Sequence, residues 1–547
     1  MMQFRLFLYV ISGILFLTAC QKDNEEEIPP VRDELTIEPA SVELAVGESC
    51  QLLVKLNGVL LEGSRVRWKS NSNMVSVDNN GKVIAISQNE FISGLQVEAF
   101  VQGLYAVCPI TIYQEYDYKL RLILKSKGSA DYSLNQSGKF LSPKAIERRQ
   151  KMNIAIDDLD LPISKDYLKQ IEKVGGKIVS QSKWLKTVCV QCEDERLIDE
   201  YKRLPFVEDV VKVWRSEKGK RRPVISSINS SVNRSVAGYS SEDYGEAWTN
   251  IALHNGQILH ERGFKGDGID IAVIDAGFID LLSNPTLNTM RIRGAKSFIY
   301  EDLNPYNVDE HGVWVTACMA TNKPGYYIGT APEANYWLLR SEDLSGDYPA
   351  EEDYWVAALE YADSVGVDVV NSSLYYVTNE WPFSSHKYEE MDGKTALPTR
   401  AANVAVSKGI FIVCCAGNHG SWVGTPADSP DVLAVGSATA DGDIGSFTAY
   451  GMTVDGRIKP DVVALGSSAC TIGIDGKIDF RSGTSYASPI ICGLAACLWQ
   501  AYPWLTNQNL LEILKKSANK YATPELPFGY GVIDIEKAIK LIEGMQE

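Results

Sequence analysis

The sequence predicts an α/β fold in its C-terminal half, with a mainly parallel sheet and helices on both faces, preceded by a β-sandwich domain and a small α+β domain. Three observations lead to this prediction. From about residue 251 onward, short apolar runs alternate with amphipathic helical stretches, the pattern of a parallel sheet buried on both faces. Residues 35–113 alternate apolar and polar side chains, and residues 117–215 mix strand-like runs with helical periodicity.

Apolar runs in the C-terminal half predict buried strands at 270–274, 335–339, 367–370, 410–415 and 432–435. In sheets of this kind, ligands gather beyond the carboxyl ends of the strands. We therefore look for functional residues at those ends and at the starts of the helices that follow.

Length and charge limit the number of domains and the kind of partner. A chain of 547 residues is too long for one core, and the usual domain size predicts roughly three or four units. Its 53 Lys and Arg against 70 Asp and Glu give a formal charge of -17. Because nucleic-acid binding needs clustered basic residues, the composition argues against a nucleic-acid partner.

Residues 1–20 have the features of an export signal. Arg5 is followed by an apolar stretch too short to span a bilayer comfortably, and small residues precede Cys20. The string Leu-Thr-Ala-Cys at 17–20 resembles the lipobox of bacterial lipoproteins, which implies lipidation of Cys20 and anchoring in the cell envelope; a plain signal peptide is the alternative. Residues 21–33 are predicted as a polar tether, and their acidic run resembles the signal for the outer face of the outer membrane.

Shifts in composition divide the rest of the chain. Residues 34–115 are predicted to form a β-sandwich, which resembles the bacterial immunoglobulin-like domains. Residues 116–217 are predicted as an α+β domain, 218–250 as an exposed polar linker, and 251–547 as the α/β domain.

Three residues of the α/β domain carry the candidate chemistry. Asp275 ends an apolar strand, where by itself it would be a turn or capping residue. His311 is followed by glycine and an apolar helix, and Ser485 lies in a Gly-Thr-Ser-x-Ala-x-Pro string where a lone serine could be only a helix cap. A serine hydroxyl becomes nucleophilic when an imidazole takes its proton and a carboxylate orients that imidazole. The three residues therefore predict one catalytic unit.

In the order Asp, His, Ser, these segments resemble the subtilisin-like serine peptidases. The resemblance runs from about residue 266 to 534, and Ala-Gly-Asn at 416–418 matches the segment that supplies the oxyanion-hole amide in that family. It implies a serine endopeptidase acting on proteins or peptides, with Asp275, His311 and Ser485 as the triad. The side chain of Asn418 and the backbone N–H of Ser485 would stabilise the oxyanion.

The same resemblance implies substrate-binding residues. Ser373 and Leu374 lie in a segment that normally reads Ser-Leu-Gly, and Ala416 and Gly417 precede the oxyanion-hole residue. Tyr375 stands where glycine is usual. This departure leaves the shape of the pocket and its side-chain preference open.

By position and general pattern, residues 116–217 resemble the inhibitory propeptide of the same enzymes; an unrelated connecting domain is the alternative. The resemblance places the first self-cleavage in the linker, between about residues 218 and 245. Structural calcium is common in the family, but no ligand set transfers to this chain. We therefore assign no metal site and expect no required cofactor.

Other histidines and cysteines are assigned structural roles. His254 and His260 lie in a polar helix-like stretch, where a solvated or helix-face position is expected, and His419 is expected to be a loop residue. Cys50 and Cys108 fall in one β-domain and form the pair to test for a disulfide.

Two classes of function remain at this point. The first is an active endopeptidase, supported by the complete Asp, His and Ser set. The second is a surface adhesin or binding protein whose peptidase domain is inactive, supported by the immunoglobulin-like module.

Overall fold

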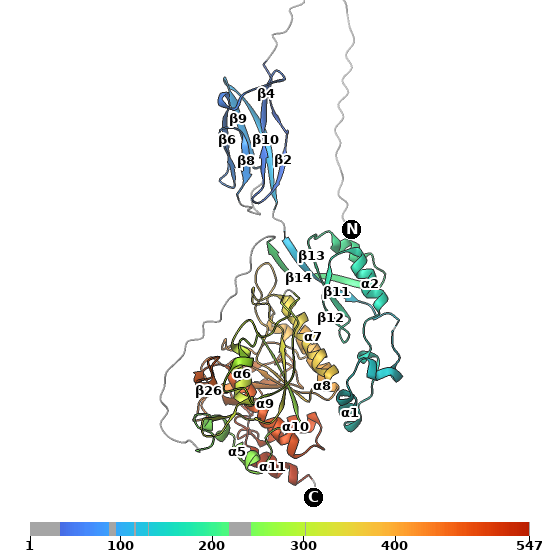
Figure 1. The fold of residues 1–547 in the computed structure, drawn as a ribbon, viewed down its shortest axis with the longest axis vertical. Helices are drawn as coiled ribbons and strands as arrows, with labels where there is room; N and C mark the ends of the chain where they lie inside the picture. The colour runs from blue at the N-terminus through green and yellow to red at the C-terminus, as the bar shows by residue number, and fades with distance from the viewer. Residues whose placement is uncertain are drawn as a thin grey trace, which may run out of the picture. The chain divides into compact units, whose positions relative to one another are not determined.

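The computed structural model describes residues 33–86, 94–113, 116–129, 131–217, 242–300 and 302–545, and the chain divides into two compact units, Met1–Glu115 and Tyr116–Glu547 (Figure 1). The predicted export signal, Cys20, nearly all of the tether and most of the linker lie outside the described residues. No helix in these described ranges is both long and apolar enough to cross a membrane.

The first unit is a β-rich domain of three small sheets. In order within each sheet, the strands are β1 (Leu35–Glu38), β4 (Leu53–Leu56) and β5 (Val59–Leu60); β2 (Val42–Ala45), β10 (Leu104–Tyr113), β9 (Gln96–Val101) and β6 (Arg67–Ser70); and β3 (Ser49–Gln51), β8 (Lys82–Ala85) and β7 (Val75–Val77). Alternate side chains, such as Val97, Ala99 and Val101, are buried in one core, as the period-two pattern predicts. Cys50 and Cys108, on strands of different sheets, are both free in this structure.

The second unit begins with an antiparallel sheet in residues 116–217. Its strand order is β12 (Lys177–Ser182), β13 (Thr187–Cys192), β11 (Tyr116–Leu124) and β14 (Val207–Glu217). Helices α1 (Pro143–Lys151), α2 (Lys165–Val174) and α3 (Leu197–Lys202) accompany the sheet. Leu120, Leu122 and Val190 pack with Ile171 of α2 in the core of this domain. The predicted order of strands and helices is confirmed.

The rest of the second unit is built around a seven-stranded sheet. Its order is β16 (Arg291–Ser297), β19 (Asn335–Arg340), β15 (Asp270–Asp275), β20 (Val369–Ser372), β21 (Phe411–Cys415), β22 (Leu433–Ala438) and β25 (Val462–Leu465). Every neighbouring pair is parallel. All five predicted strands are present, with ends that differ by a few residues.

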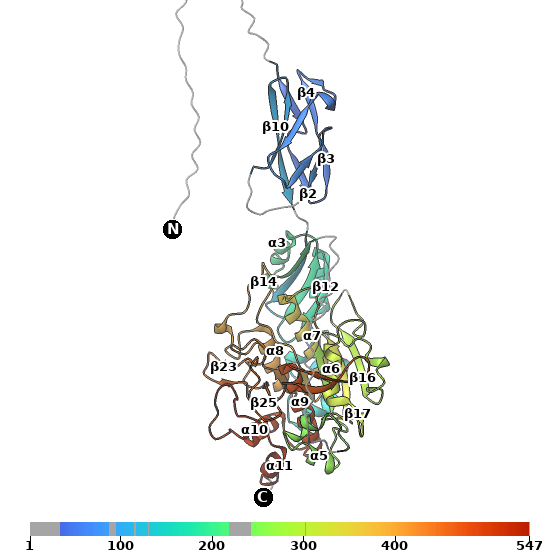
Figure 2. The same cartoon turned by 90° about the vertical axis from the view of Figure 1, so that its left-hand side faces the viewer.

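Helices cover both faces of this sheet, as predicted. Ile271 and Val273 of β15 join the core that contains α6 (His311–Ala320) and α9 (Thr484–Ala501). Ala272 and Ile274 pack with α7 (Pro349–Val365) and α8 (Leu397–Ser407) on the other face; the four helices are labelled in Figure 2. Burial on both faces explains why these strands are apolar throughout.

The remaining elements surround this core. They are α4 (Trp248–Ala252), α5 (Gln257–Glu261), α10 (Asn507–Ser517), α11 (Ile535–Glu543), and the hairpins β17 (Asn322–Lys323) with β18 (Tyr327–Ile328), β23 (Gly451–Met452) with β24 (Ile458–Lys459), and β26 (Ala469–Ile472) with β27 (Ile478–Arg481). The linker prediction is wrong for residues 242–250. Tyr244, Ala247 and Asn250 are buried there, because they complete the core beside α6 and α9.

The 116–217 domain packs on α7 through buried ion pairs. Arg121 of β11 donates to the carboxylate of Asp353 at 2.8 Å. Arg148 and Arg149 of α1 lie 2.5 and 2.8 Å from the two carboxylate oxygens of Asp363. Because these groups are shielded from water, each charge depends on its partner, and losing one partner would be costly.

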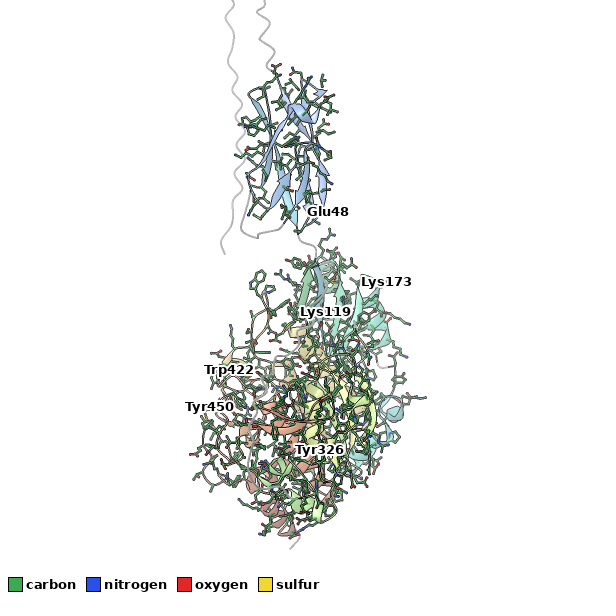
Figure 3. All side chains as sticks on the ribbon, turned by 60° about the vertical axis from the view of Figure 1, so that its left-hand side comes forward. Glu48, Lys119, Lys173, Tyr326, Trp422 and Tyr450 are labelled. Carbon is green, nitrogen blue, oxygen red and sulfur yellow. The ribbon has the colours of Figure 1, made fainter. Side chains whose placement is uncertain are left out.

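Two further contacts extend this interface. Lys119, labelled in Figure 3, is fully buried, and its Nζ lies 3.2 Å from Asp343 Oδ2. The carboxylate of Glu360 accepts from the Ser182 hydroxyl at 2.5 Å and from the Trp184 backbone N–H at 3.0 Å. The acidic groups on and before α7 therefore find matching donors across the interface.

Candidate active site

Asp275 and His311 meet at the carboxyl end of β15. Asp275 is the last residue of that strand and is fully buried, and His311 is the first residue of α6. His311 Nδ1 lies 2.7 Å from Asp275 Oδ1. A carboxylate can only accept, so Nδ1 carries the proton and Nε2 is left to accept one.

Two glycines allow these segments to approach each other. A Cβ on Gly277 would collide with the carbonyl of Val308, and one on Gly312 would collide with the carbonyl of Gly277. The Gly312 N–H donates to that same Gly277 carbonyl at 3.1 Å. Glycine therefore follows both candidate residues because only a residue without a side chain fits there.

The surroundings of His311 favour its protonated form. Burial lowers the pKa of the ring, but the charge and hydrogen bond of Asp275, with the nearby carboxylates of Asp309 and Glu342, raise it more, so the pKa lies above the ordinary value of 6.5. Asp309 also accepts from the His311 backbone N–H at 2.8 Å, which holds the start of α6. Such an imidazole is suited to take a proton from a hydroxyl.

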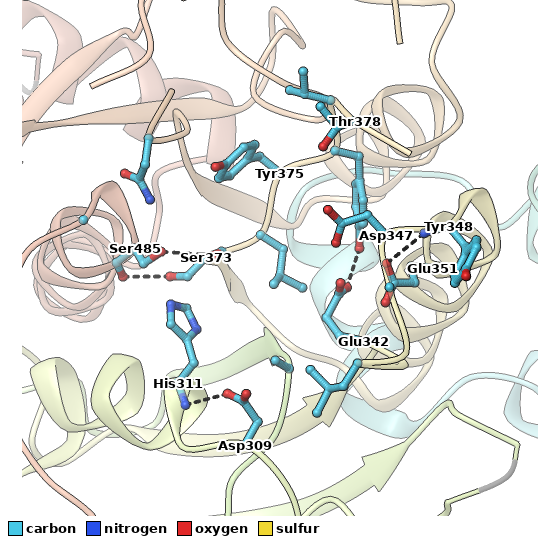
Figure 4. A pocket seen from close by; sticks show the side chains of 18 of the residues that line it. Asp309, His311, Glu342, Asp347, Tyr348, Glu351, Ser373, Tyr375, Thr378 and Ser485 are labelled. Carbon is cyan, nitrogen blue, oxygen red and sulfur yellow. Dashed lines mark hydrogen bonds between the residues drawn. The ribbon is translucent and has the colours of Figure 1, made fainter. Parts of the chain in front are cut away.

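Ser485 lies in the first turn of α9, with 6% of its surface exposed. Its hydroxyl donates to the Ser373 carbonyl at 3.4 Å, while the Ser373 hydroxyl donates to the Ser485 carbonyl at 2.8 Å. The long Ser485 hydroxyl contact leaves this group able to rotate, whereas the short bond fixes the backbone. Figure 4 shows Ser485 and His311 on the same side of one cavity.

Asn418 follows β21 and lies close to the start of α9. Its Oδ1 accepts from the backbone N–H and the hydroxyl of Thr484, both at 2.9 Å. The side-chain amide N–H groups remain as donors at the cavity, which Asn418 also lines. The backbone N–H of Ser485 is in the first helical turn, where such groups have no partner within the helix. Two donors thus flank the candidate nucleophile.

The cavity that joins these groups has a volume of about 420 Å³. It is lined by His311, Ser485 and Asn418, and by Ser373 and Leu374 among others. The sequence predictions for these five residues therefore converge on one place.

Comparison with known proteins identifies the family. Residues 266–532 match the model of the subtilase family, and residues 119–226 match the peptidase S8 propeptide domain of Bacteroidota. The chain is 30% identical over 375 residues to subtilisin NAT of Bacillus subtilis subsp. natto, covering 67% of this chain and 84% of that protein. It is equally similar to subtilisin E of Bacillus subtilis strain 168, and 32% identical over 287 residues to subtilisin of Bacillus pumilus, covering 51% of this chain and 94% of that protein.

The chain belongs to the subtilase family. It is a serine endopeptidase with a propeptide domain, and it therefore acts on protein or peptide substrates. The segment that matches the propeptide model, residues 119–226, has bounds close to those of the predicted 116–217 domain. The α/β fold of residues 251–547 is the fold of this family.

Two of the expected substrate-binding residues do not reach the cavity of this subtilase. Ala416 and Gly417 are buried and lie outside its lining, and their contact with substrate stays a prediction. Their N–H groups are already bonded, to the Val435 carbonyl at 3.0 Å and the Thr484 hydroxyl at 3.2 Å. These two bonds fix the end of β21 and thereby position Asn418.

Tyr375 changes one wall of the cavity. Its ring lies 5.5 Å from that of His419 in a stacked arrangement, and it lines the cavity where glycine is usual. Burial raises the pKa of its hydroxyl, so Tyr375 stays neutral near pH 7. His419 is an exposed loop residue whose Nε2 bonds the Trp422 carbonyl at 2.9 Å, which confirms its predicted place.

His254 and His260 are both buried, so neither takes the solvated position, the first of the two positions that the sequence predicts for them; His260 lies on helix α5. His254 Nδ1 lies 3.2 Å from the Ile533 carbonyl, and His260 bonds the Tyr244 hydroxyl at 2.8 Å. Burial lowers the pKa of each ring to about 4, so both stay neutral. The neighbouring residues in the sequence are polar, and the groups that bury these two rings lie in distant parts of the chain.

Sequence reasoning missed an acidic wall of the cavity, formed by Glu342, Asp347 and Glu351. These residues lie between β19 and the first turn of α7. Figure 4 shows their carboxylates across the cavity from Ser485. The run of acidic residues after β19 was the available signal, but nothing local indicates which of them face the cavity.

Proposed function

We propose that this subtilase hydrolyses peptide bonds with Ser485 as the nucleophile, His311 as the general base and Asp275 as the residue that orients His311. The single observation that carries this proposal is the 2.7 Å bond between His311 and Asp275, with Ser485 in the same cavity. The bond leaves Nε2 of His311 as the acceptor for the serine proton.

The reaction proceeds in two halves. Ser485 Oγ attacks the substrate carbonyl while His311 takes the hydroxyl proton, and His311 then gives that proton to the leaving amine. Water repeats the sequence on the acyl-enzyme and releases the second product. Asp275 stays ionised and stabilises the imidazolium. Asn418 Nδ2 and the Ser485 N–H donate to the oxyanion in both halves.

This reaction requires no cofactor, because the protein and water supply every group that moves a proton or stabilises charge. Structural calcium, if the protein uses it, would act on stability and not in these steps. Leu374 and Ser373 bind the substrate beside Ser485, since both line the cavity.

A fluorophosphonate probe, which reacts with activated serines, tests the triad on the full-length chain. The wild type should be labelled and should hydrolyse casein, whereas Ser485→Ala should do neither. Substantial turnover by purified Ser485→Ala would exclude Ser485 as the nucleophile. A folded wild type without labelling or turnover would favour the surface-binding alternative.

Residues 116–217 act as an internal inhibitor until the chain is cut. The buried ion pairs with α7 support this role. So does the end of β14, where the ring of Trp214 lies 6.3 Å from that of Tyr348, a residue lining the cavity. N-terminal sequencing of the active species, with Ser485→Ala as the uncut control, tests this role. An active enzyme that keeps its N-terminal half would exclude it.

Cys20 carries a lipid that anchors the chain in the cell envelope, at the outer membrane and facing outward. The lipobox-like string and the acidic run after it support this proposal. The β-rich first unit, read as an immunoglobulin-like domain, then serves as a spacer. Cys20→Ser should move the uncut protein from the membrane fraction to the soluble fraction. Unchanged fractionation would mean that another element anchors the protein.

A further inference from the structure

The loop after β19 and helix α7 present carboxylates to two different surroundings. Those that face the propeptide domain, such as Asp353 and Asp363, are paired with cations of that domain. Glu342, Asp347 and Glu351 instead face the active-site cavity. Across the part of the chain that the structure describes, no Lys, Arg or His forms an ion pair with these three residues.

Glu342 and Glu351 are held by hydrogen bonds from uncharged donors, and no cation among the described residues pairs with any of the three carboxylates. Glu351 is 4% exposed and accepts from the Asp343 backbone N–H at 2.9 Å. Glu342 accepts from the Tyr376 hydroxyl at 2.8 Å. Burial, with repulsion from neighbouring carboxylates, raises the pKa of Glu342 to about 7 and the pKa of Glu351 well above its ordinary range. Asp347 has a more exposed side chain, and its pKa is raised by partial burial and by the charge of Glu380. A cation arriving at this wall would relieve both effects.

The position of this wall decides which part of a substrate it contacts. Figure 4 shows the three carboxylates across the cavity from Ser485. They would therefore contact substrate side chains that lie at a distance from the bond that is cut. Trp214 of β14 lies against Tyr348, next to Asp347. Trp214, near the end of β14, therefore lies beside the acidic wall, and a chain bound with the same direction as β14 would place the residues before the cut bond against this wall.

The sequence immediately after β14 has the complementary charge. β14 ends at Glu217, and the next five residues are Lys218, Gly219, Lys220, Arg221 and Arg222. Extended chain covers roughly 3.3 Å per residue, so residues 215–222 reach about 26 Å from Trp214. The propeptide domain thus pairs its own cations with one set of acids, and the sequence that follows it contains four more cations.

We propose that the acidic wall selects substrates with Lys or Arg among the four residues before the cut bond, and that the first such substrate is residues 218–222 of this chain. The inference rests on the proposed function. It places the self-cleavage between residues 220 and 225, where at least two of the four cations precede the cut. Binding of basic side chains at the acidic wall would then govern both the self-cleavage and the later choice of substrate.

Two internally quenched peptides test the selectivity of enzyme purified from full-length expression. They differ only in Lys-Arg-Arg or Gln-Gln-Gln before the cut bond. The wild type should prefer the basic peptide by at least about 50-fold in kcat/KM. Glu342→Gln, Asp347→Asn and Glu351→Gln should each lower this ratio by about 10-fold, because each removes a charge-assisted contact. Glu389→Gln, at an exposed carboxylate outside the lining, should change the ratio less than threefold.

The outcomes separate the two proposals. A wild type that hydrolyses both peptides equally well overturns the basic selectivity while leaving the peptidase mechanism intact. An unchanged kcat/KM ratio in all three acidic-wall variants overturns the assignment of the wall. Among the three, Asp347→Asn is the variant least able to disturb folding, because Asp347 is exposed. A wild type that neither hydrolyses a peptide nor reacts with the fluorophosphonate probe overturns the proposed function and this inference with it.

Self-cleavage gives an independent measurement on the full chain. Mass spectrometry should place the new terminus between residues 220 and 225. Replacing Lys218, Lys220, Arg221 and Arg222 by Gln should slow the cut at least about 10-fold, whereas Ala at Ser226 and Ser227 should not. A cut elsewhere in the linker at an unchanged rate would overturn the proposed substrate.

Discussion

Two buried ion pairs of this subtilase use the same chemistry for different ends. The pair of His311 and Asp275, at 2.7 Å, leaves the imidazole 16% exposed toward the cavity, and the pair of Arg148 and Asp363, at 2.5 Å, is sealed with only 2% of the guanidinium exposed. Histidine gains and loses a proton near neutral pH, whereas arginine stays charged. The first pair is therefore built for turnover and the second for holding two domains together.

The comparison teaches that burial alone does not reveal the role of a charge. What matters is whether the charge can titrate and whether a ligand can reach it. Removing a partner at the active site should change rates much more than stability, and removing one at the propeptide interface should do the reverse. The following changes test this contrast in order of decreasing effect.

His311→Ala should lower kcat/KM by roughly 10⁴- to 10⁶-fold, because members of a catalytic triad act as a unit. His311 lies between Asp275 and the cavity and is partly exposed there, so its removal would open Asp275 to water, and the unfolding temperature should change much less than the rate. Peptide hydrolysis and thermal unfolding measure the two effects. Combining His311→Ala with Ser485→Ala should add almost no further loss, and additive losses would show that the residues act independently.

Asp363→Asn should lower the free energy of unfolding by about 3–5 kcal/mol, because it leaves two buried guanidinium groups without their shared carboxylate. Denaturant unfolding of the uncut Ser485→Ala chain measures this change without interference from self-cleavage. Glu536→Gln, which breaks an exposed pair with Lys540, is the matched control and should cause no resolvable change. Equal effects of the two substitutions would contradict a sealed interface.

Asn418→Ala should reduce kcat by roughly 10²- to 10³-fold with little change in KM, since its amide bonds the oxyanion mainly in the transition state. Steady-state kinetics on one peptide separates the two parameters. Because Asn418 Oδ1 also holds Thr484, Asn418→Asp is informative: it keeps the acceptor and removes the donor. Full activity of Asn418→Asp would rule out the oxyanion role.

The pH profile should show the smallest effect. His311 must be neutral to accept a proton, and its pKa lies above 6.5 because Asp275 outweighs burial. Activity should therefore be lost as the pH falls through a value above 6.5, and kcat/KM reports this titration in the free enzyme. An acid limb centred at or below 6.5 would mean that Asp275 does not raise the proton affinity of His311.

The sequence alone predicts the α/β architecture, the order of the propeptide and peptidase domains, and the candidate residues Asp275, His311, Ser485 and Asn418. Local patterns carry this information. A buried parallel strand reads as an apolar run, and glycines that permit close approach stand next to the residues they serve. Such signals need no knowledge of partners elsewhere in the chain.

Only the tertiary structure decided which polar residues are buried and which acids face the cavity. His260 bonds the Thr330 carbonyl 70 positions away, and Arg148 pairs with Asp363 215 positions away. Glu342 and Asp343 are neighbours, yet one lines the cavity and the other bonds Lys119 of the propeptide domain. The physical reason is that burial and charge pairing depend on contacts between distant segments, which the local periodicity of a sequence does not encode.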